Sequence, residues 1–250
     1  MMKKLTACIL IIYFSPLKSQ ESIQTDRPDQ TESVSITPKK FIQIETGFLY
    51  EKVDGGSRNF VHPNILWKYG INENFEVRLI TEFLTEKTAT TKLSGFSPLA
   101  FGFKAKLTEE KRYLPKISFL AHITANKLSS EELKTHYPAS YFRFLFQHTF
   151  SDRLNLGYNL GAEWNGETPG PTGIYTISGA YAVTDQLGGF VESYGFISES
   201  QNADHRFNGG ITYLVNENLQ ADLSSGFGIS KTSPDYHFSC GISYRFSTYK

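Results

Sequence analysis

Residues 150–164 have the sequence FSDRLNLGYNLGAEW, in which a short polar turn is followed by a regularly alternating run. From Leu154 to Trp164 every second residue is apolar or aromatic, and the residues between them are Asn, Gly or Glu. Successive side chains of a β-strand point to opposite faces of its sheet, so this run has one apolar face and one polar face of mostly small residues. The pattern predicts an amphipathic β-strand.

The polar turn before this strand belongs to a repeated pattern: an apolar residue, then Ser, Thr or Asn, an acid, any residue, and Leu or Phe. Short polar side chains hydrogen-bond to their own backbone at such positions, so each copy predicts a tight hairpin. The four copies span residues 71–75, 150–154, 183–187 and 215–219. A fifth, looser connection spans residues 108–114, and Pro115 opens the next strand, where its missing N–H costs little.

Alternating runs fill the chain from residue 40 onwards, and we expect twelve strands of the ~9–11 residues that a tilted strand needs to cross a membrane. Tight turns follow every second strand, and longer polar stretches follow the others. Short periplasmic turns, longer outer loops and an even strand count are typical of outer-membrane barrels. The expected strands are 40–50, 60–70, 75–84, 98–107, 115–124, 139–150, 154–164, 173–183, 187–196, 206–215, 219–228 and 236–246.

We therefore predict an all-β fold, a transmembrane antiparallel up-and-down β-barrel formed by residues 40–250. A water-soluble barrel or sandwich would also alternate, but its apolar face would be the interior and its exterior would be charged. Here the polar face is rich in Gly, Ser and Asn, while bulky aromatic residues lie near the strand ends. They would suit aromatic girdles at the two membrane interfaces, and they are Tyr69, Phe75, Phe150, Tyr158, Trp164 and Tyr181.

The first residues have the layout of an export signal. Lys3 and Lys4 precede an apolar stretch over residues 5–14, which ends at a polar break. We expect residues 1–19 to be a cleavable secretory signal peptide, cut near residue 19 or 20, and the mature protein to reside in the cell outer membrane. The expected partners are outer-membrane lipid, the barrel-assembly machinery and a small-molecule solute.

Charge and cysteine content exclude some classes of protein. The whole chain has 25 basic and 25 acidic residues, and removal of residues 1–19 deletes three lysines and no acid, which leaves 22 basic residues and a net charge of −3. This balance offers no concentrated basic surface for a nucleic acid. Only Cys240 remains after cleavage, so no intramolecular disulfide is expected.

Charged residues fall on the polar face of the expected strands. A charge that faces lipid costs about 2–4 kcal/mol at mid-membrane, so these residues should point into the lumen. Two interpretations stay open: a mixed-charge pore wall that orients a solute, or a salt-bridge network that fills a narrow barrel. The residues are Glu45, Lys68, Glu76, Arg78, Glu82, Lys104, Arg143, Glu163, Glu192, Asp222 and Arg245.

Residues 24–33 (QTDRPDQTES) and 41–48 (FIQIETGF) form the most recognisable stretch. They resemble the start of the outer-membrane transporters grouped as the MetA-pathway family of phenol degradation, and the Thr-Asp-Arg-Pro-Asp motif resembles the members found in Bacteroidetes. Residues 66–71 and 102–106 resemble later parts of the same family. The resemblance implies an outer-membrane barrel that passes small solutes, with aromatic molecules among the candidates.

The motif Asp26-Arg27-Pro28-Asp29 precedes the first expected strand, within residues 20–39, which we expect to form a periplasmic N-terminal segment. Two interpretations remain for this motif. It folds back as a plug or gate, or it is a linker with an Asx-type turn; Pro28 stiffens the backbone in both.

An enzymatic function finds little support. His237 and Ser239 have the spacing that an outer-membrane phospholipase would use, but no acid or amide near them is identifiable as the third member of a triad. No pair of histidines has metal-ligand spacing, and we expect no cofactor. The leading hypothesis is a channel or transporter for small hydrophilic or amphipathic solutes. The alternatives are a structural or surface-interaction barrel with a plugged lumen and functional outer loops, and an outer-membrane lipid hydrolase.

Overall fold

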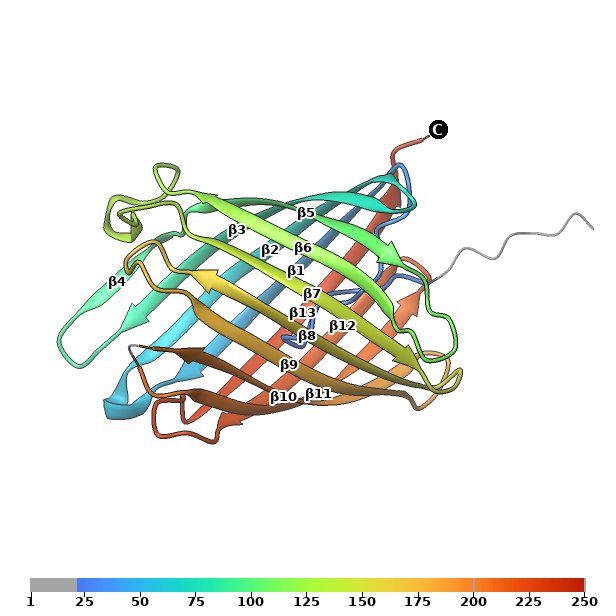
Figure 1. Cartoon of the computed structure of the whole chain (residues 1–250). Coiled ribbons are helices and arrows are strands. Elements are labelled where there is room, and N and C mark those ends of the chain that lie inside the picture. Colours follow the sequence, from blue (N-terminus) through green and yellow to red (C-terminus); the bar gives the residue numbers. More distant parts are fainter. Residues whose placement is uncertain (1–21, 200, 250) are drawn as a thin grey trace, which may run out of the picture.

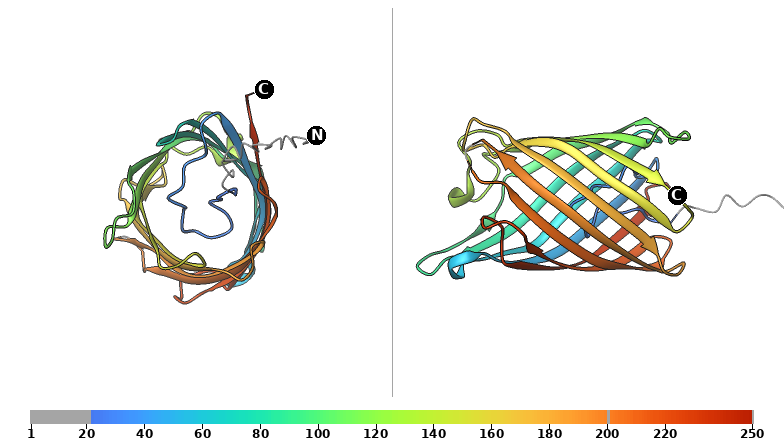
Figure 2. Two further views of the ribbon diagram at one scale, coloured as in Figure 1. Left: turned by 90° about the vertical axis from the view of Figure 1, so that its right-hand side faces the viewer. Right: turned by 60° about the horizontal axis from the view of Figure 1, so that its bottom comes forward.

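The computed structural model describes residues 22–199 and 201–249, and the expected signal peptide lies outside them. The described chain is a closed β-barrel (Figures 1 and 2). Its strands are β1 (Phe41–Lys52), β2 (Arg58–Asn72), β3 (Phe75–Lys87), β4 (Lys92–Phe96), β5 (Leu99–Thr108), β6 (Lys116–Ala125), β7 (Ser140–Thr149), β8 (Leu154–Trp164), β9 (Thr172–Ala182), β10 (Leu187–Ser198), β11 (Asp204–Asn216), β12 (Leu219–Gly228) and β13 (Tyr236–Ser247).

Every strand pairs antiparallel with its neighbours, and β1 pairs with both β2 and β13, which closes the barrel. The short strand β4 extends the hairpin with β3 beyond the wall, pairing with residues 83–87. The first part of β3, residues 75–80, pairs with β5. Because β4 and β5 pair with successive parts of the same edge of β3, they count as one strand of the barrel. The barrel is therefore twelve-stranded, and the predicted fold class and strand count are confirmed.

Two short 3-10 turns, η1 (Asp54–Gly56) and η2 (Glu131–Leu133), lie in the longer loops. The loops after β1, β6, β8, β10 and β12 and the β3–β4 hairpin are at one end of the barrel, and the tight turns and the looser connection 109–115 are at the other (Figure 1). The expected side chains close these turns: Asn72 and Asn216 accept bonds from backbone N–H groups two residues later, at 2.8 and 2.9 Å. Among the described residues, no helix is long and apolar enough to span a membrane.

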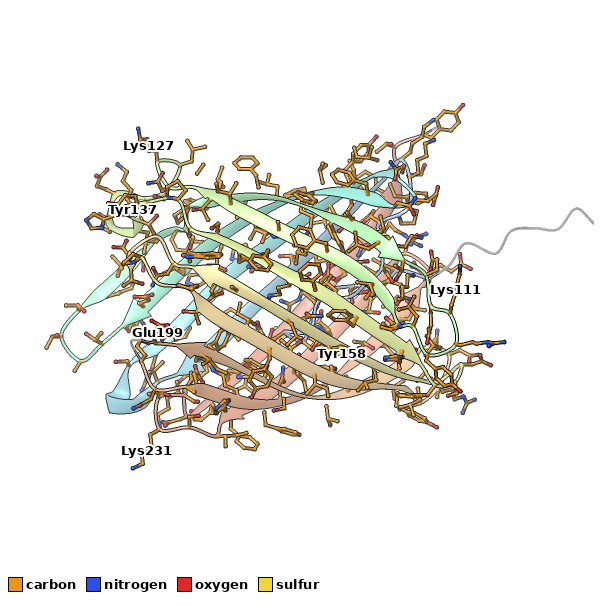
Figure 3. All side chains as sticks on the ribbon, viewed as in Figure 1. Lys111, Lys127, Tyr137, Tyr158, Glu199 and Lys231 are labelled. Atoms are coloured by element: carbon orange, nitrogen blue, oxygen red, sulfur yellow. The ribbon has the colours of Figure 1, made fainter. Side chains whose placement is uncertain are left out.

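The side-chain distribution is the reverse of that in a soluble domain. Glu45, Glu76 and Lys104 are fully buried in the interior, whereas Leu223 and Ile242 on the outer face are 55% and 53% exposed. Figure 3 shows labelled charged residues at the two ends of the barrel and Tyr158 on the wall between them. An apolar band around a polar interior is the arrangement of a transmembrane barrel, and a soluble protein rarely exposes so large an apolar surface.

The expected girdle residues lie on the wall. Phe150 and Tyr181 are exposed, close to the end with tight turns. Phe75 stacks on Phe103 with ring centroids 5.5 Å apart, and Tyr158 stacks on Phe146 at 4.8 Å. These cross-strand aromatic pairs add packing energy between neighbouring strands, in addition to the ladder of backbone hydrogen bonds.

Residues 22–38, which we call the lumen segment, lie inside the barrel (Figure 2, left). The segment expected on the periplasmic side enters the lumen from the end with tight turns. It is held there by the backbone bond from Ile23 N to Glu217 O (2.8 Å) and by the bridge between Lys39 and Gly70. A Cβ atom on Gly70 would lie 2.2 Å from the carbonyl oxygens of Thr37 and Pro38, so only glycine lets the segment pass this close to β2.

Candidate functional site

Three carboxylates of the barrel wall hold the backbone of the lumen segment. Glu45, Glu76 and Glu192 accept hydrogen bonds from backbone N–H groups that no strand satisfies. Such N–H groups need acceptors when buried, and a charged acceptor makes a stronger bond than a neutral one. The bonds run from Asp26 and Arg27 to Glu45 (2.9 and 3.0 Å), from Thr37 to Glu76 (2.6 Å), and from Gln30 and Thr31 to Glu192 (3.0 and 2.6 Å).

Asp26 is the centre of a buried ion cluster. Its carboxylate lies 2.9 Å from Lys68 Nζ, 2.7 Å from Lys104 Nζ and 3.3 Å from Arg78 Nη1. The sheet brings these cations together, because Lys68 and Arg78 are cross-strand partners on β2 and β3, and β5 follows with Lys104. Arg78 also pairs with Glu32 of the lumen segment at 3.0 Å. Two carboxylates of the segment therefore balance cations from three adjacent strands.

The Arg27 side chain contacts β12 and β13, which lie on the other side of β1 from the ion cluster. Its Nε and Nη2 donate to the two oxygens of Asp222 at 3.3 and 3.0 Å, and Nη2 also donates to Ser239 Oγ at 2.9 Å. A Cβ atom on Gly47 would lie 2.2 Å from the Arg27 guanidinium, and one on Gly241 would lie 2.3 Å from its Nε. The two glycines thus form the slot in which the guanidinium lies.

An apolar contact holds the C-terminal half of the lumen segment against the wall. Val34 packs against Leu120 of β6 and Leu145 of β7, with Tyr141 beside them, and the three aliphatic residues are almost completely buried. Ser118 Oγ donates a hydrogen bond of 2.7 Å to Val34 O. Full burial of an aliphatic side chain contributes about 1.5–3 kcal/mol, so this contact is a substantial part of the docking energy.

The middle of the segment contacts β8 and β9. Asn159 Oδ1 accepts a hydrogen bond from Glu32 N (2.7 Å), and Asn159 Nδ2 donates to Glu32 O (3.2 Å). Thr31 Oγ1 donates to Thr176 Oγ1 at 2.8 Å. Together with the contacts above, these bonds join the segment to strands around the whole circumference of the barrel.

The lumen segment separates two cavities. The outer cavity, of about 390 Å³, opens towards the longer loops, and its wall includes Leu66, Tyr141 and Tyr194. The inner cavity, of about 370 Å³, lies near the tight turns, and its wall includes Asn155 and Gly188. The two cavities have no wall residue in common; the residues that line both are Arg27, Pro28, Asp29 and Glu32 of the lumen segment.

The residues predicted to line a pore divide into three groups. Eight contact the lumen segment: Glu45, Lys68, Glu76, Arg78, Lys104, Arg143, Glu192 and Asp222. Glu82 and Glu163 line the outer cavity, as does Arg143, whose Nη1 donates to Gln30 O at 2.8 Å. Arg245 lies near the tight turns, where its Nη2 donates to Glu217 O at 3.2 Å.

Several residues that anchor the segment were not predicted from the sequence, among them Thr31, Glu32, Val34 and Asn159. One available signal was the placement of Leu120 and Leu145 in the polar phase of their strands, which indicates an apolar contact inside the lumen. Ser239, considered above as a hydrolase residue, instead receives a hydrogen bond from Arg27. Among the described residues, no group of three or more His, Cys, Asp or Glu is placed to hold a metal ion.

Comparison with known proteins identifies a family and similar structures that cover most of the barrel. The family model described as "Putative MetA-pathway of phenol degradation" matches residues 25–246. An outer membrane channel from Pseudomonas putida F1 is similar in structure, with a TM-score of 0.68, 9% identity, and coverage of 86% of this chain and 98% of that chain. The porins NanC (TM-score 0.56, 7% identity, coverage 81% and 98%) and KdgM (0.52, 12%, 81% and 99%) are also similar. Comparison with curated proteins gives no match.

Proposed function

The chain belongs to the family of the MetA pathway of phenol degradation, and we propose that it is an outer-membrane channel for small hydrophilic or amphipathic solutes, narrowed by its own N-terminal segment. The similar solved structures are channels and porins, but at identities of 7–12% they establish the fold alone. The channel function therefore rests on the geometry of this lumen.

One observation carries the proposal. The two cavities lie on opposite sides of the lumen segment and share only residues of that segment. A solute that enters the outer cavity therefore reaches the inner one by passing Arg27, Pro28, Asp29 and Glu32. Both cavities combine polar and apolar side chains, which suits solutes with both kinds of surface.

The segment is built to move without unfolding the barrel. The segment forms no hydrogen-bond ladder with any strand of the wall. Most of the wall groups that contact it are side chains. Both of its ends lie at the tight-turn end, near Glu217 and Gly70. A loop that enters and leaves by the same opening can withdraw without threading through the barrel. The alternative, a barrel plugged for structural reasons, predicts a segment that never leaves.

Solute flux in proteoliposomes tests the proposal. We expect the folded full-length protein to pass the neutral sugar arabinose faster than protein-free vesicles do, with flux falling steeply for the larger sugar raffinose. The reason is that each cavity is only large enough for a small solute. Retention of arabinose in vesicles that contain correctly folded, heat-modifiable barrels would contradict the channel function. Cell fractionation should place the same band in the outer membrane.

A further inference from the structure

We propose that Arg143 forms a carboxylate-binding site in the outer cavity, for solutes that join one carboxylate to an apolar body. The inference rests on the proposed channel function and names the class of solute that the outer cavity selects. Three observations support it: the other arginines of the cavity pair with acids, Arg143 is largely buried, and apolar residues line another part of the wall.

Arg143 differs from the other arginines that line the outer cavity. Each of the others forms an ion pair: Arg27 with Asp222 (3.0 Å), Arg78 with Glu32 (3.0 Å), and Arg206 with Glu51 (2.8 Å). Within residues 22–199 and 201–249, no carboxylate makes an ion pair with Arg143. The cavity therefore contains one guanidinium that no acid contacts within ion-pair distance; Glu163, on the neighbouring strand β8, attracts it from farther away.

The environment of Arg143 leaves part of its hydrogen-bonding capacity unused. The residue is only 9% exposed, its Nη1 donates to Gln30 O at 2.8 Å, and its Cζ lies 5.7 Å from the ring centroid of Tyr141. Its Nε has no acceptor among the described residues. A largely buried charge is costly without a counter-ion, and guanidinium groups pair with carboxylates through planar, often bidentate, bonds. A carboxylate is thus the ligand that this group lacks.

Part of the outer cavity suits an apolar body. Leu49, Leu66 and Ile80 line one part of its wall, and Tyr141 and Tyr194 line another. The volume of about 390 Å³ is within the range of small-molecule sites. A solute with one ring or a short aliphatic chain can therefore contact this wall while its carboxylate pairs with Arg143.

Acidic residues in the same cavity affect which anions can bind. Glu82 and Glu163 also line it, and neither contacts a cation among the described residues. Their charges oppose the entry of anions in general, since fields inside a low-dielectric cavity are weakly screened. A chloride ion has no apolar surface to offset this repulsion, whereas an amphipathic carboxylate does. The site should therefore discriminate between anions by their apolar part.

Equilibrium binding to the full-length protein in lipid nanodiscs tests the site. The probe is fluorine-labelled phenylacetate at pH 8, followed by ¹⁹F NMR, with binding to empty nanodiscs subtracted. We expect Arg143→Gln to weaken binding about tenfold or more, because it removes a charge-assisted pair. Arg143→Lys should restore part of the affinity. Arg58→Gln is the matched control: it removes an exposed arginine of β2 that does not line the cavity, and affinity should stay within about twofold.

A second comparison needs no variant. Fluorine-labelled 2-phenylethanol and 2-phenylethylamine have similar bodies but carry no charge and a positive charge, and both should bind the native protein more weakly than phenylacetate. Equal affinity of the native protein and Arg143→Gln for phenylacetate would overturn the inference, as would stronger binding of the amine. Arabinose flux is measured separately, so loss of the channel function and loss of this site give different results.

Discussion

Replacing Asp26 with Asn is expected to release the lumen segment from the wall and to raise arabinose flux several-fold. Asp26 is buried and contacts Lys68, Arg78 and Lys104. Removing one member of a buried ion cluster leaves uncompensated charge and costs about 3–5 kcal/mol. The barrel wall keeps its own hydrogen-bond ladders in the variant. We therefore expect the segment to leave its place on the wall while the barrel stays folded.

Hydrogen exchange measured by mass spectrometry reports the undocking directly. In the native protein the N–H groups of Asp26, Gln30 and Thr31 are bonded to wall carboxylates, and in the variant they should exchange much faster. Asp235→Asn is the control. Asp235 forms a partly exposed ion pair with Lys52 at 3.0 Å, and such a pair contributes at most about 1 kcal/mol to stability. Unchanged exchange and flux in Asp26→Asn would show that the ion cluster does not hold the segment.

Placing an arginine on the outer face should impair insertion into a membrane. Leu223, near the middle of β12, is 55% exposed, although it is apolar. If this face lies in hydrocarbon, Leu223→Arg costs about 2–4 kcal/mol, and the yield of folded, heat-modifiable protein in liposomes should fall sharply. A barrel in water would tolerate the same exposed arginine with little effect.

The neighbouring residue supplies the matched control. Ser224 points to the opposite face, is 7% exposed, and lines the outer cavity. An arginine there would face the polar lumen, so Ser224→Arg should fold considerably better than Leu223→Arg. Equal loss of folding in both variants would mean that the outer face of β12 does not contact lipid.

The strands could be predicted from sequence because their signal is local. The ranges 154–164 and 219–228 match β8 and β12 at both ends, since a polar turn pattern marks the start of each strand. Strand β4 was not predicted and lies within the stretch expected to be a loop. It pairs only with the end of β3 beyond the wall, and five residues of mixed character do not establish a period.

The position of the lumen segment could not be predicted in the same way. Its sequence has no strand or helix period, so the motif at Asp26 was compatible with both a plug and a linker. Docking depends on groups from distant strands, such as Lys104 and Asp222, whose convergence only the closed barrel provides. The alternation along each strand predicts that the charged side chains point inward. It does not predict which groups these side chains contact. Eight of the residues predicted to line the lumen contact the segment.

A reversible disulfide between the segment and the wall tests the central claim, that solutes pass the lumen only when this segment moves. The hydroxyl oxygens of Thr31 and Thr176 are 2.8 Å apart, so cysteines at these two positions should have sulfur atoms close enough to bond. The pair is introduced together with Cys240→Ser, and mass spectrometry verifies the bond. We predict that arabinose flux falls towards that of protein-free vesicles when the disulfide forms and recovers when a reductant breaks it. Equal flux in the oxidised and reduced protein would contradict the account.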